Sequence, residues 1–215
     1  MNDMLKNYKH IIWDWNGTLF NDVDLCVNII NNILIKRELE ALTLDKYRNI
    51  FRFPVKDYYR DAGLDFDAQS FEVLGKEWMD EYEIRKAECF LFPDVKKVLE
   101  YLDSIGIEQS VLSAYSQHTL EEIIDKLEIK KYFKNIKGLD NIYAESKMEL
   151  GQELMREIET HEGVVLIGDT LHDFDVAKEL KIGCILVSNG HQSKEQLIAS
   201  GCLVINSLNN LLEIL

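Results

Sequence analysis

The sequence predicts an α/β fold: a Rossmann-like, mostly parallel sheet flanked by helices, with an inserted small all-helical cap domain. Two observations lead to this prediction. From residue 93 onward, short apolar runs alternate with helical segments, which is typical of a parallel sheet covered on both faces. Residues 22–87 instead show apolar residues at helical spacing and no convincing strand. We therefore expect a sheet domain of residues 1–20 and 88–215, and a cap domain of residues 21–87.

The individual elements follow from the same patterns. The first strand is the apolar run Ile11-Ile12-Trp13, which ends at Asp14. In the insertion, helices are expected from about residue 22 to 34 and near 43–51, 55–62 and 67–86. A helix then runs from Pro93 to Gly106, because proline favours a helix start and glycine a helix end. The remaining elements are strands at 107–112, 135–138, 164–167, 183–187 and 203–205, helices at 117–127, 146–158, 173–180 and 193–199, and a closing helix.

The composition narrows the classes of protein that fit. The formal net charge of −14 argues against a partner such as nucleic acid, which requires a basic surface. None of the four cysteines forms a Cys-x-x-Cys pair, so we expect buried thiols in a reducing compartment. The N-terminus, Met1–Lys6, is not followed by an apolar signal region, and the apolar stretches are too short to span a bilayer. These features predict a cytoplasmic protein without membrane contact. We expect a monomer or homodimer.

Acidic residues follow two of the expected strands. Asp14 follows the first, and Asp169 and Asp173 follow the strand at 164–167. Ligands of open parallel sheets bind beyond the carboxyl ends of the strands. Taken singly, these residues are explained as helix caps or turn residues. Together, two acidic strand ends repel each other unless a cation or proton lies between them, and carboxylate oxygens suit a hard cation. The pattern therefore favours a metal site.

Two further positions suit an anionic ligand. Ser113 ends an apolar run, and its hydroxyl and the backbone amides after it, including that of Ala114, can donate to phosphate oxygens. Lys147 stands at an expected helix start, where a cation is unfavourable against the helix dipole. The alternatives are simple loop polarity for Ser113 and a solvated surface lysine for Lys147.

The order and spacing of these residues resemble the haloacid dehalogenase-like (HAD) superfamily of hydrolases. Its four motifs are similar, in order, to Asp14-Trp15-Asn16-Gly17-Thr18-Leu19, Val111-Leu112-Ser113, Lys147 and Ile167-Gly168-Asp169-x-x-x-Asp173. The helical insertion after the first motif resembles the cap of the phosphoglycolate phosphatase-like branch. The resemblance implies a phosphatase acting on a small phosphorylated metabolite. Asp14 would attack phosphorus and form an aspartyl-phosphate, while Ser113 and Lys147 would stabilise the phosphoryl oxygens.

The resemblance also implies a Mg²⁺ site and exposes one departure. Mg²⁺ would be held by the Asp14 carboxylate, the backbone carbonyl of Asn16, and Asp169. Asp173 would support the site from behind these ligands or through a water molecule. The family's first motif normally reads Asp-x-Asp, and its second Asp acts as general acid and base. Here that residue is Asn16, which keeps the carbonyl ligand but cannot transfer a proton. General acid–base catalysis contributes on the order of 10²–10⁴-fold in rate.

Three hypotheses address this departure. The enzyme acts on esters with good leaving groups, or another residue supplies the proton, for which His118, His172 and His191 are candidates. Alternatively, the protein is a low-activity or non-catalytic phosphate-binding regulator. The third hypothesis is deamidation of Asn16 before Gly17, which the intact mass would reveal. A phosphomutase is disfavoured because it depends on the same acid–base step.

Substrate selection is expected to involve the segment around residues 52–60. Pro54 is expected to open a helix, which places Arg52 and Phe53 on the preceding loop. We predict that this loop faces the catalytic residues and that Arg52 contacts a substrate anion. The alternative is that Phe53 packs within the cap and Arg52 is solvated.

Overall fold

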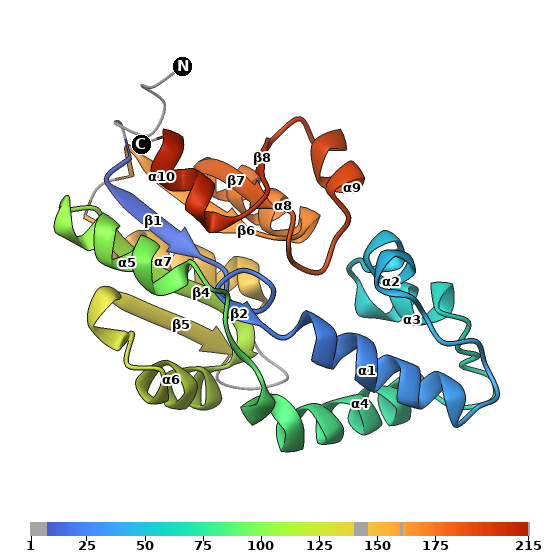
Figure 1. The fold of residues 1–215 in the computed structure, drawn as a ribbon. Helices are drawn as coiled ribbons and strands as arrows, with labels where there is room; N and C mark the ends of the chain where they lie inside the picture. The colour runs from blue at the N-terminus through green and yellow to red at the C-terminus, as the bar shows by residue number, and fades with distance from the viewer. Residues whose placement is uncertain (1–7, 140–145, 160, 215) are drawn as a thin grey trace.

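A six-stranded parallel sheet forms the centre of the molecule, as the sequence predicts. The computed structural model describes residues 8–139, 146–159 and 161–214. The strand order is β5-β4-β1-β6-β7-β8 (Figure 1). The strands are β1 (His10–Trp13), β4 (Glu108–Ser116), β5 (Asn135–Leu139), β6 (Val164–Gly168), β7 (Gly183–Val187) and β8 (Leu203–Ile205).

The register of the central strands brings the catalytic candidates to one edge. Trp13 of β1 pairs with Val111 of β4 on one side and with Ile167 of β6 on the other. All four residues of β1 and all five of β6 are buried, which explains why both read as continuous apolar runs. The residues that follow β1 and β6, Asp14 and Asp169, therefore leave the sheet side by side.

Helices cover both faces of the sheet, and strand alternation divides its core in two. Ile11 and Trp13 point into the cluster that contains α5 (Val95–Ser104) and α6 (Gln117–Lys126). Ile12 points to the other side, into the cluster that contains α7 (Lys147–Glu157) and α8 (Leu171–Leu180). The remaining helices are α9 (Lys194–Ala199) and α10 (Leu211–Ile214).

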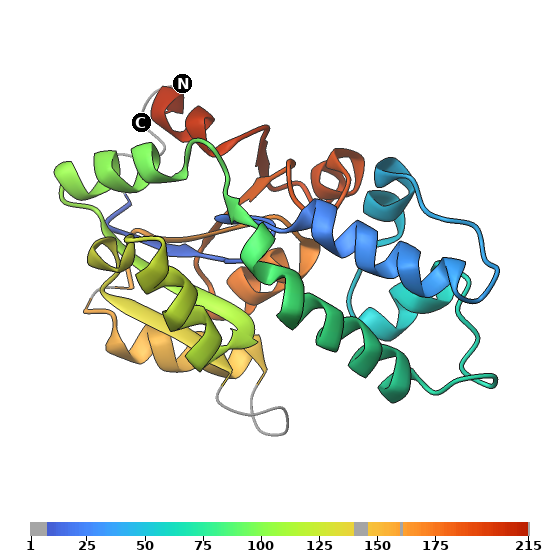
Figure 2. The same cartoon turned by 60° about the horizontal axis from the view of Figure 1, so that its bottom comes forward.

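Four helices between β1 and α5 form a separate region with its own apolar cluster, which we call the helical region. They are α1 (Val23–Ile35), α2 (Leu44–Ile50), α3 (Val55–Asp61) and α4 (Phe71–Arg85). Both views show this region beyond one end of the sheet, with α1 and α4 packed side by side (Figure 2). A short antiparallel pair, β2 (Phe20–Asn21) and β3 (Phe90–Leu91), links it to the sheet. Two-residue strands carry too little pattern for the sequence to predict them.

The structure corrects two expectations: the position of Ser113 relative to its strand, and the burial of the four cysteines. Strand β4 continues through Ser113, with a register shift between Leu112 and Ser116, so Ser113 lies within the strand and not after it. Only Cys26 is a buried thiol; Cys89, Cys184 and Cys202 are half-buried, and all four are free.

The expectation about the N-terminal segment Met1–Lys6 lies outside the described residues. Within the described part of the chain, no helix is long and apolar enough to cross a membrane.

Candidate active site

A buried trio of charged side chains lies at the carboxyl edge of β1. Lys147, the first residue of α7, donates from Nζ to Asp14 Oδ1 and, at 2.5 Å, to Asp173 Oδ1. All three side chains are at most 10% exposed. Burial opposes the charge of Lys147, but Asp14 and Asp173 outweigh it and raise the lysine pKa. Lys147 is therefore a fixed internal cation and not the solvated surface lysine that the sequence also allowed.

Asp169 approaches this trio from the end of β6. Its Oδ1 accepts a hydrogen bond from Thr18 Oγ1 at 3.1 Å, and its Oδ2 accepts from the His191 backbone NH at 2.6 Å. Gly17, at φ +74°, allows the close approach, because a Cβ there would stand 2.3 Å from Asp169 Oδ2. The loop after Asp14 thus requires glycine at position 17, both for its positive φ and because a side chain there would collide with Asp169.

The carboxylates show where a cation is needed. Burial raises the pKa of Asp14 to about 6, because Lys147 offsets the desolvation only in part and Asp173 adds to it. Burial, with the charges of Asp14 and Asp173, raises the pKa of Asp169 to about 8 despite the nearby His191. Carboxyls held this far above their ordinary pKa lack positive charge, which a divalent cation would supply.

The three acidic side chains fit a metal ion in different ways. Each of Asp14, Asp169 and Asp173 offers an oxygen, and these oxygens lie within 4.8 Å of one another. Asp173, however, accepts from Lys147 with Oδ1 and from the backbone NH and hydroxyl of Thr170 with Oδ2, at 3.0 and 2.7 Å. These bonds hold the pKa of Asp173 below its usual value, with Lys147 the largest of the causes that overcome burial. The geometry therefore suits Asp14 and Asp169 as direct ligands and Asp173 as support behind them.

Asn16 turns its amide toward the helical region. Its Nδ2 donates to Asp22 Oδ2 and to the Tyr82 hydroxyl, each at 2.8 Å, and Tyr82 in turn donates to the same oxygen of Asp22 at 2.8 Å. The side chain at the acid–base position is thus held by a buried carboxylate six residues further along the chain. A protonated carboxyl has one O–H and could donate only one of the two bonds, whereas the amide of Asn16 donates both at any pH.

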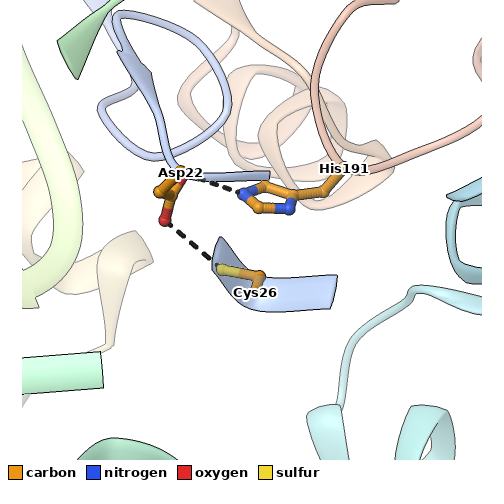
Figure 3. Close-up of side chains that lie close together, drawn as sticks. All are labelled: Asp22, Cys26 and His191. Atoms are coloured by element: carbon orange, nitrogen blue, oxygen red, sulfur yellow. Dashed lines mark hydrogen bonds and ion pairs between the residues drawn. The ribbon is translucent and has the colours of Figure 1, made fainter. Parts of the chain in front are cut away.

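Asp22 is the centre of a second buried cluster (Figure 3). The His191 ring and the Cys26 thiol reach it from different sides, with His191 Nε2 3.2 Å from Oδ1 and Cys26 Sγ 3.5 Å from Oδ2. Tyr47 OH lies 2.8 Å from the other ring nitrogen of His191. Burial opposes charge on the ring, but Asp22 and then Asp169 outweigh it and raise the His191 pKa to about 9.

This second cluster has the residue types of a metal site, and its ligand atoms also lie within 4.8 Å of one another. We interpret it as a hydrogen-bonded cluster for a physical reason. Burial and the charge of Asp22 raise the pKa of the Cys26 thiol well above its ordinary value, and thiolate is the form that binds metals. The protonated ring of His191 is likewise a hydrogen-bond donor and not a ligand.

A cavity of about 380 Å³ opens between the sheet and the helical region. Its lining includes most of the candidates expected from the sequence: Asp14, Asn16, Ser113, Ala114, Lys147, Asp169 and Asp173. Ser113 is almost fully buried, and its Oγ accepts from the backbone NH of Tyr115 at 3.1 Å. The strand ends and the start of α7 thus meet at one site, which supports the prediction of a shared phosphate-binding edge.

Other candidates lie differently. Phe53 lines the cavity, whereas Arg52 is not among the lining residues and pairs with Asp61 at 2.8 Å. The substrate contact predicted for Arg52 stays a prediction. Of the three histidines, His172 and His191 line the cavity, and the exposed His118 does not.

Sequence reasoning missed Asp22, Tyr82 and Tyr47. Asp22 directly precedes α1, where an aspartate is the usual N-cap, yet its side chain makes no capping hydrogen bond and serves the site instead. Tyr82 belongs to a run of aromatic residues at helical spacing that reads as ordinary packing. The sequence does contain a carboxylate, Asp22, shortly after the neutral Asn16. Only the structure shows that these two side chains are hydrogen-bonded to each other.

Comparison with known proteins shows which proteins the chain is similar to. The family model described as haloacid dehalogenase-like hydrolase matches residues 11–187. A phosphoglycolate phosphatase of Synechococcus elongatus is 22% identical over 194 residues, which cover 88% of each protein. One from Pseudomonas putida is 22% identical over 212 residues, covering 94% of this chain and 78% of the relative.

Solved structures share the fold over nearly the whole chain. A hydrolase of the haloacid dehalogenase-like family from Streptococcus pneumoniae superposes with a TM-score of 0.80 at 20% identity, covering 96% of this chain and 97% of that one. A putative phosphoglycolate phosphatase from Lactobacillus delbrueckii gives a TM-score of 0.77 at 18% identity, covering 97% and 99%.

Proposed function

The chain belongs to the haloacid dehalogenase-like hydrolase family, and from that premise we propose that it is a Mg²⁺-dependent phosphatase for a small phosphate monoester. The proposed activity is similar to that named for its phosphoglycolate phosphatase relatives. One observation supports it most: the Asp14 carboxylate lines a cavity while bound to the buried cation Lys147, with Asp169 beside it. Nucleophile, cation and metal-ligand oxygens are the parts that phosphoryl transfer requires.

In the first step, a carboxylate oxygen of Asp14 attacks phosphorus. The new bond joins that oxygen to phosphorus, the bond from phosphorus to the ester oxygen breaks, and its electron pair leaves on that oxygen. In the second step, water attacks the aspartyl-phosphate, which releases inorganic phosphate and restores the Asp14 carboxylate. Lys147 donates a hydrogen bond to Asp14, so it is close enough to neutralise charge on the phosphoryl oxygens in both steps. Ser113 and Ala114 also line the cavity.

Mg²⁺ is expected to bind the Asp14 carboxylate, the Asn16 backbone carbonyl and Asp169, with Asp173 holding Lys147 behind them. Bound there, it would supply positive charge to the transferring phosphoryl group. The raised pKa values of Asp14 and Asp169 support this proposal, because a cation beside them would favour the ionised form of both carboxyls. The proposal includes a cytoplasmic enzyme that acts as a monomer or homodimer.

The alternative is a low-activity or non-catalytic phosphate-binding protein. Asn16 favours it, because its amide is held by Asp22 and Tyr82 and cannot transfer a proton. The nucleophile and its cation are nevertheless intact, so the first step remains available to an ester whose leaving group needs no proton.

The deciding experiment is an assay of phosphate monoesters with and without Mg²⁺. We expect turnover that requires Mg²⁺ and disappears in Asp14→Asn. Turnover that survives Asp14→Asn would contradict the nucleophile assignment. An inert wild type with an active Asn16→Asp variant would establish the regulatory alternative.

A further inference from the structure

The cavity has two unlike walls. The core wall consists of Asp14, Ser113, Lys147, Asp169 and Asp173, and the helical wall includes Phe53, Tyr58, Tyr59, Phe71, Trp78 and Tyr82. In phosphoryl transfer, the attacking and leaving oxygens lie roughly in line on opposite sides of phosphorus. A phosphate held at the core wall therefore directs its leaving group toward the helical wall.

The helical wall offers no free cation to a leaving group. Among the described residues, Lys147 is the only lysine or arginine that lines the cavity, and it is bound to Asp14 and Asp173. The six residues 140–145, outside the described part, include neither lysine nor arginine. A carboxylate on the leaving group would therefore be buried without a free lysine or arginine beside it, which is unfavourable.

The arginines of the helical region are engaged elsewhere. Arg48 donates to the backbone carbonyls of Asn189 and Gly190, at 2.8 and 2.9 Å. The other four form ion pairs with carboxylates: Arg37 with Glu77, Arg52 with Asp61, Arg60 with Asp57, and Arg85 with Glu81 and Glu88. None of the five lines the cavity. The charged pair beside the helical wall, Asp22 with His191, is engaged with itself, so the described residues of the wall present aromatic side chains and no free cation.

Asn16 also restricts the leaving group, because its amide cannot protonate the departing oxygen. An alkyl ester must expel an oxygen whose conjugate acid is about as weak as water, with a pKa near 15.7. A phenol resembles the tyrosine side chain, with a pKa near 10, and leaves as phenolate without a proton. A site whose acid–base position is an amide held by Asp22 and Tyr82 thus works best on a phenolic ester.

From the aromatic wall and Asn16 together, we infer that the substrate is an aryl phosphate monoester, whose ring packs against the helical wall while its phosphate lies at Asp14. This inference rests on the proposed phosphatase function and departs from the carboxylated substrate that the relatives' names indicate. Rings pack favourably against aromatic side chains, and the 380 Å³ cavity is in the range of small-molecule sites.

The reaction balances without a proton donor in the first step. The bond from phosphorus to the aryl oxygen breaks as the bond to Asp14 forms, and phenolate leaves with the electron pair. Water then transfers its hydroxyl to phosphorus and releases one proton, while the bond from phosphorus to Asp14 breaks and its electron pair returns to the carboxylate. Phenolate takes up a proton from solvent, so the overall reaction consumes one water and yields a phenol and inorganic phosphate.

Binding of inert analogues tests the substrate class without turnover. Benzylphosphonate and phosphonoacetate carry the same phosphonate on a ring or on a carboxylate, and calorimetry with Mg²⁺ compares their affinities for the wild type. We expect benzylphosphonate to bind at least about tenfold more tightly. Equal or tighter binding of phosphonoacetate would overturn the inference. Tighter binding of the phosphonate analogue of phosphocholine would also overturn it, since aromatic walls accept quaternary ammonium groups as well.

Variants locate the ring. Phe53→Ala and Trp78→Ala should each raise the KM for phenyl phosphate about tenfold and leave kcat within about twofold. Phe90→Ala is the matched control, because Phe90 is 70% exposed and does not line the cavity. Melting temperatures verify folding, and a KM unchanged in both wall variants would contradict the assignment. A loss of phosphonoacetate affinity in Arg52→Ala would do so too, because Arg52 would then provide the missing cation.

The same assays separate this inference from the proposed function. Turnover of phenyl phosphate that is lost in Asp14→Asn supports both. Asp14-dependent turnover that prefers phosphoglycolate to phenyl phosphate leaves the phosphatase intact and overturns the aryl substrate. Absence of Asp14-dependent turnover across the panel removes the proposed function, and the inferred aryl ester with it.

Discussion

The core wall and the helical wall of the cavity differ in both chemistry and construction. The core wall carries charges, each held by a partner, as Lys147 is by Asp14 and Asp173. It is built on strand ends, and the pairing of Trp13 with Val111 and Ile167 fixes the register that places these ends next to one another. The helical wall is aromatic and belongs to a separate apolar cluster. The comparison teaches that the sheet fixes the charged side chains of the cavity, whereas its aromatic side chains come from helices with an apolar cluster of their own.

The largest expected effect is at the nucleophile. Asp14→Asn should lower phosphatase turnover by at least about 10⁴-fold, because an amide neither attacks phosphorus nor carries a phosphoryl group. Steady-state rates with Mg²⁺ measure this, and acid-quench mass spectrometry should find a phosphorylated Asp14 only in the wild type. The control is Asp24→Asn on the exposed side of α1, for which a comparable loss would show that the effect is not specific.

Lys147→Met tests whether the core wall depends on its internal cation. Removing the cation leaves Asp14 and Asp173 buried without it, and breaking a buried pair typically costs about 3–5 kcal/mol in the free energy of unfolding. Urea denaturation in EDTA should show this loss, and Mg²⁺ should recover part of it. Lys130→Met, which removes an exposed pair with Asp125, should change stability by less than about 1 kcal/mol. A loss of similar size in both variants would refute the special role of Lys147.

The acid–base position links the two walls. Asn16→Asp combined with Asp22→Asn exchanges carboxylate and amide and preserves the hydrogen bond between them. We expect turnover of alkyl phosphates to rise about 10²-fold, within the range of general acid–base catalysis, and turnover of phenyl phosphate to change little. Asn16→Asp alone places two carboxylates 2.8 Å apart and should gain less. An equal rise for both ester classes would show that the leaving group does not limit the wild type.

The smallest expected effect is a pH dependence of stability from His191. Its folded pKa of about 9 exceeds the ordinary value of about 6.5, so the folded state binds the proton more tightly. This contribution is complete below about pH 6.5 and is lost as pH rises to about 9, by at most about 3 kcal/mol. Asp22, Asp169, Asp14 and the Tyr47 hydroxyl face the ring.

Unfolding free energies in EDTA at pH 6.5 and 9 measure the effect, with His191→Gln as reference. Asp169 and Asp14 also have raised pKa values, so their contributions to stability likewise fall as pH rises, that of Asp169 up to about pH 8. Only the difference between wild type and variant therefore reports on His191. A variant with the full pH dependence of the wild type would exclude it as the cause.

Most of the fold could be predicted because the signals are local. Apolar runs such as Val164-Val165-Leu166-Ile167 mark buried strands, and the residues that follow them mark the ligand edge. The prediction failed where the signal was not local. The two-residue strands β2 and β3 exist only because they pair with each other, and β4 extends past Ser113 through its contact with β5.

What the sequence determined by itself was which set of residues gathers at the carboxyl edge of the sheet, because most of them follow a strand or lie at the start of a helix, and sheet pairing brings such positions together. Only the tertiary structure decided how that set is completed. Asn16 meets Asp22 and also Tyr82, which is 66 residues away, and Arg52 pairs with Asp61 outside the cavity. The direction of a side chain depends on which helices pack beside it, and burial changes its charge. Neither is written in a local pattern of residues.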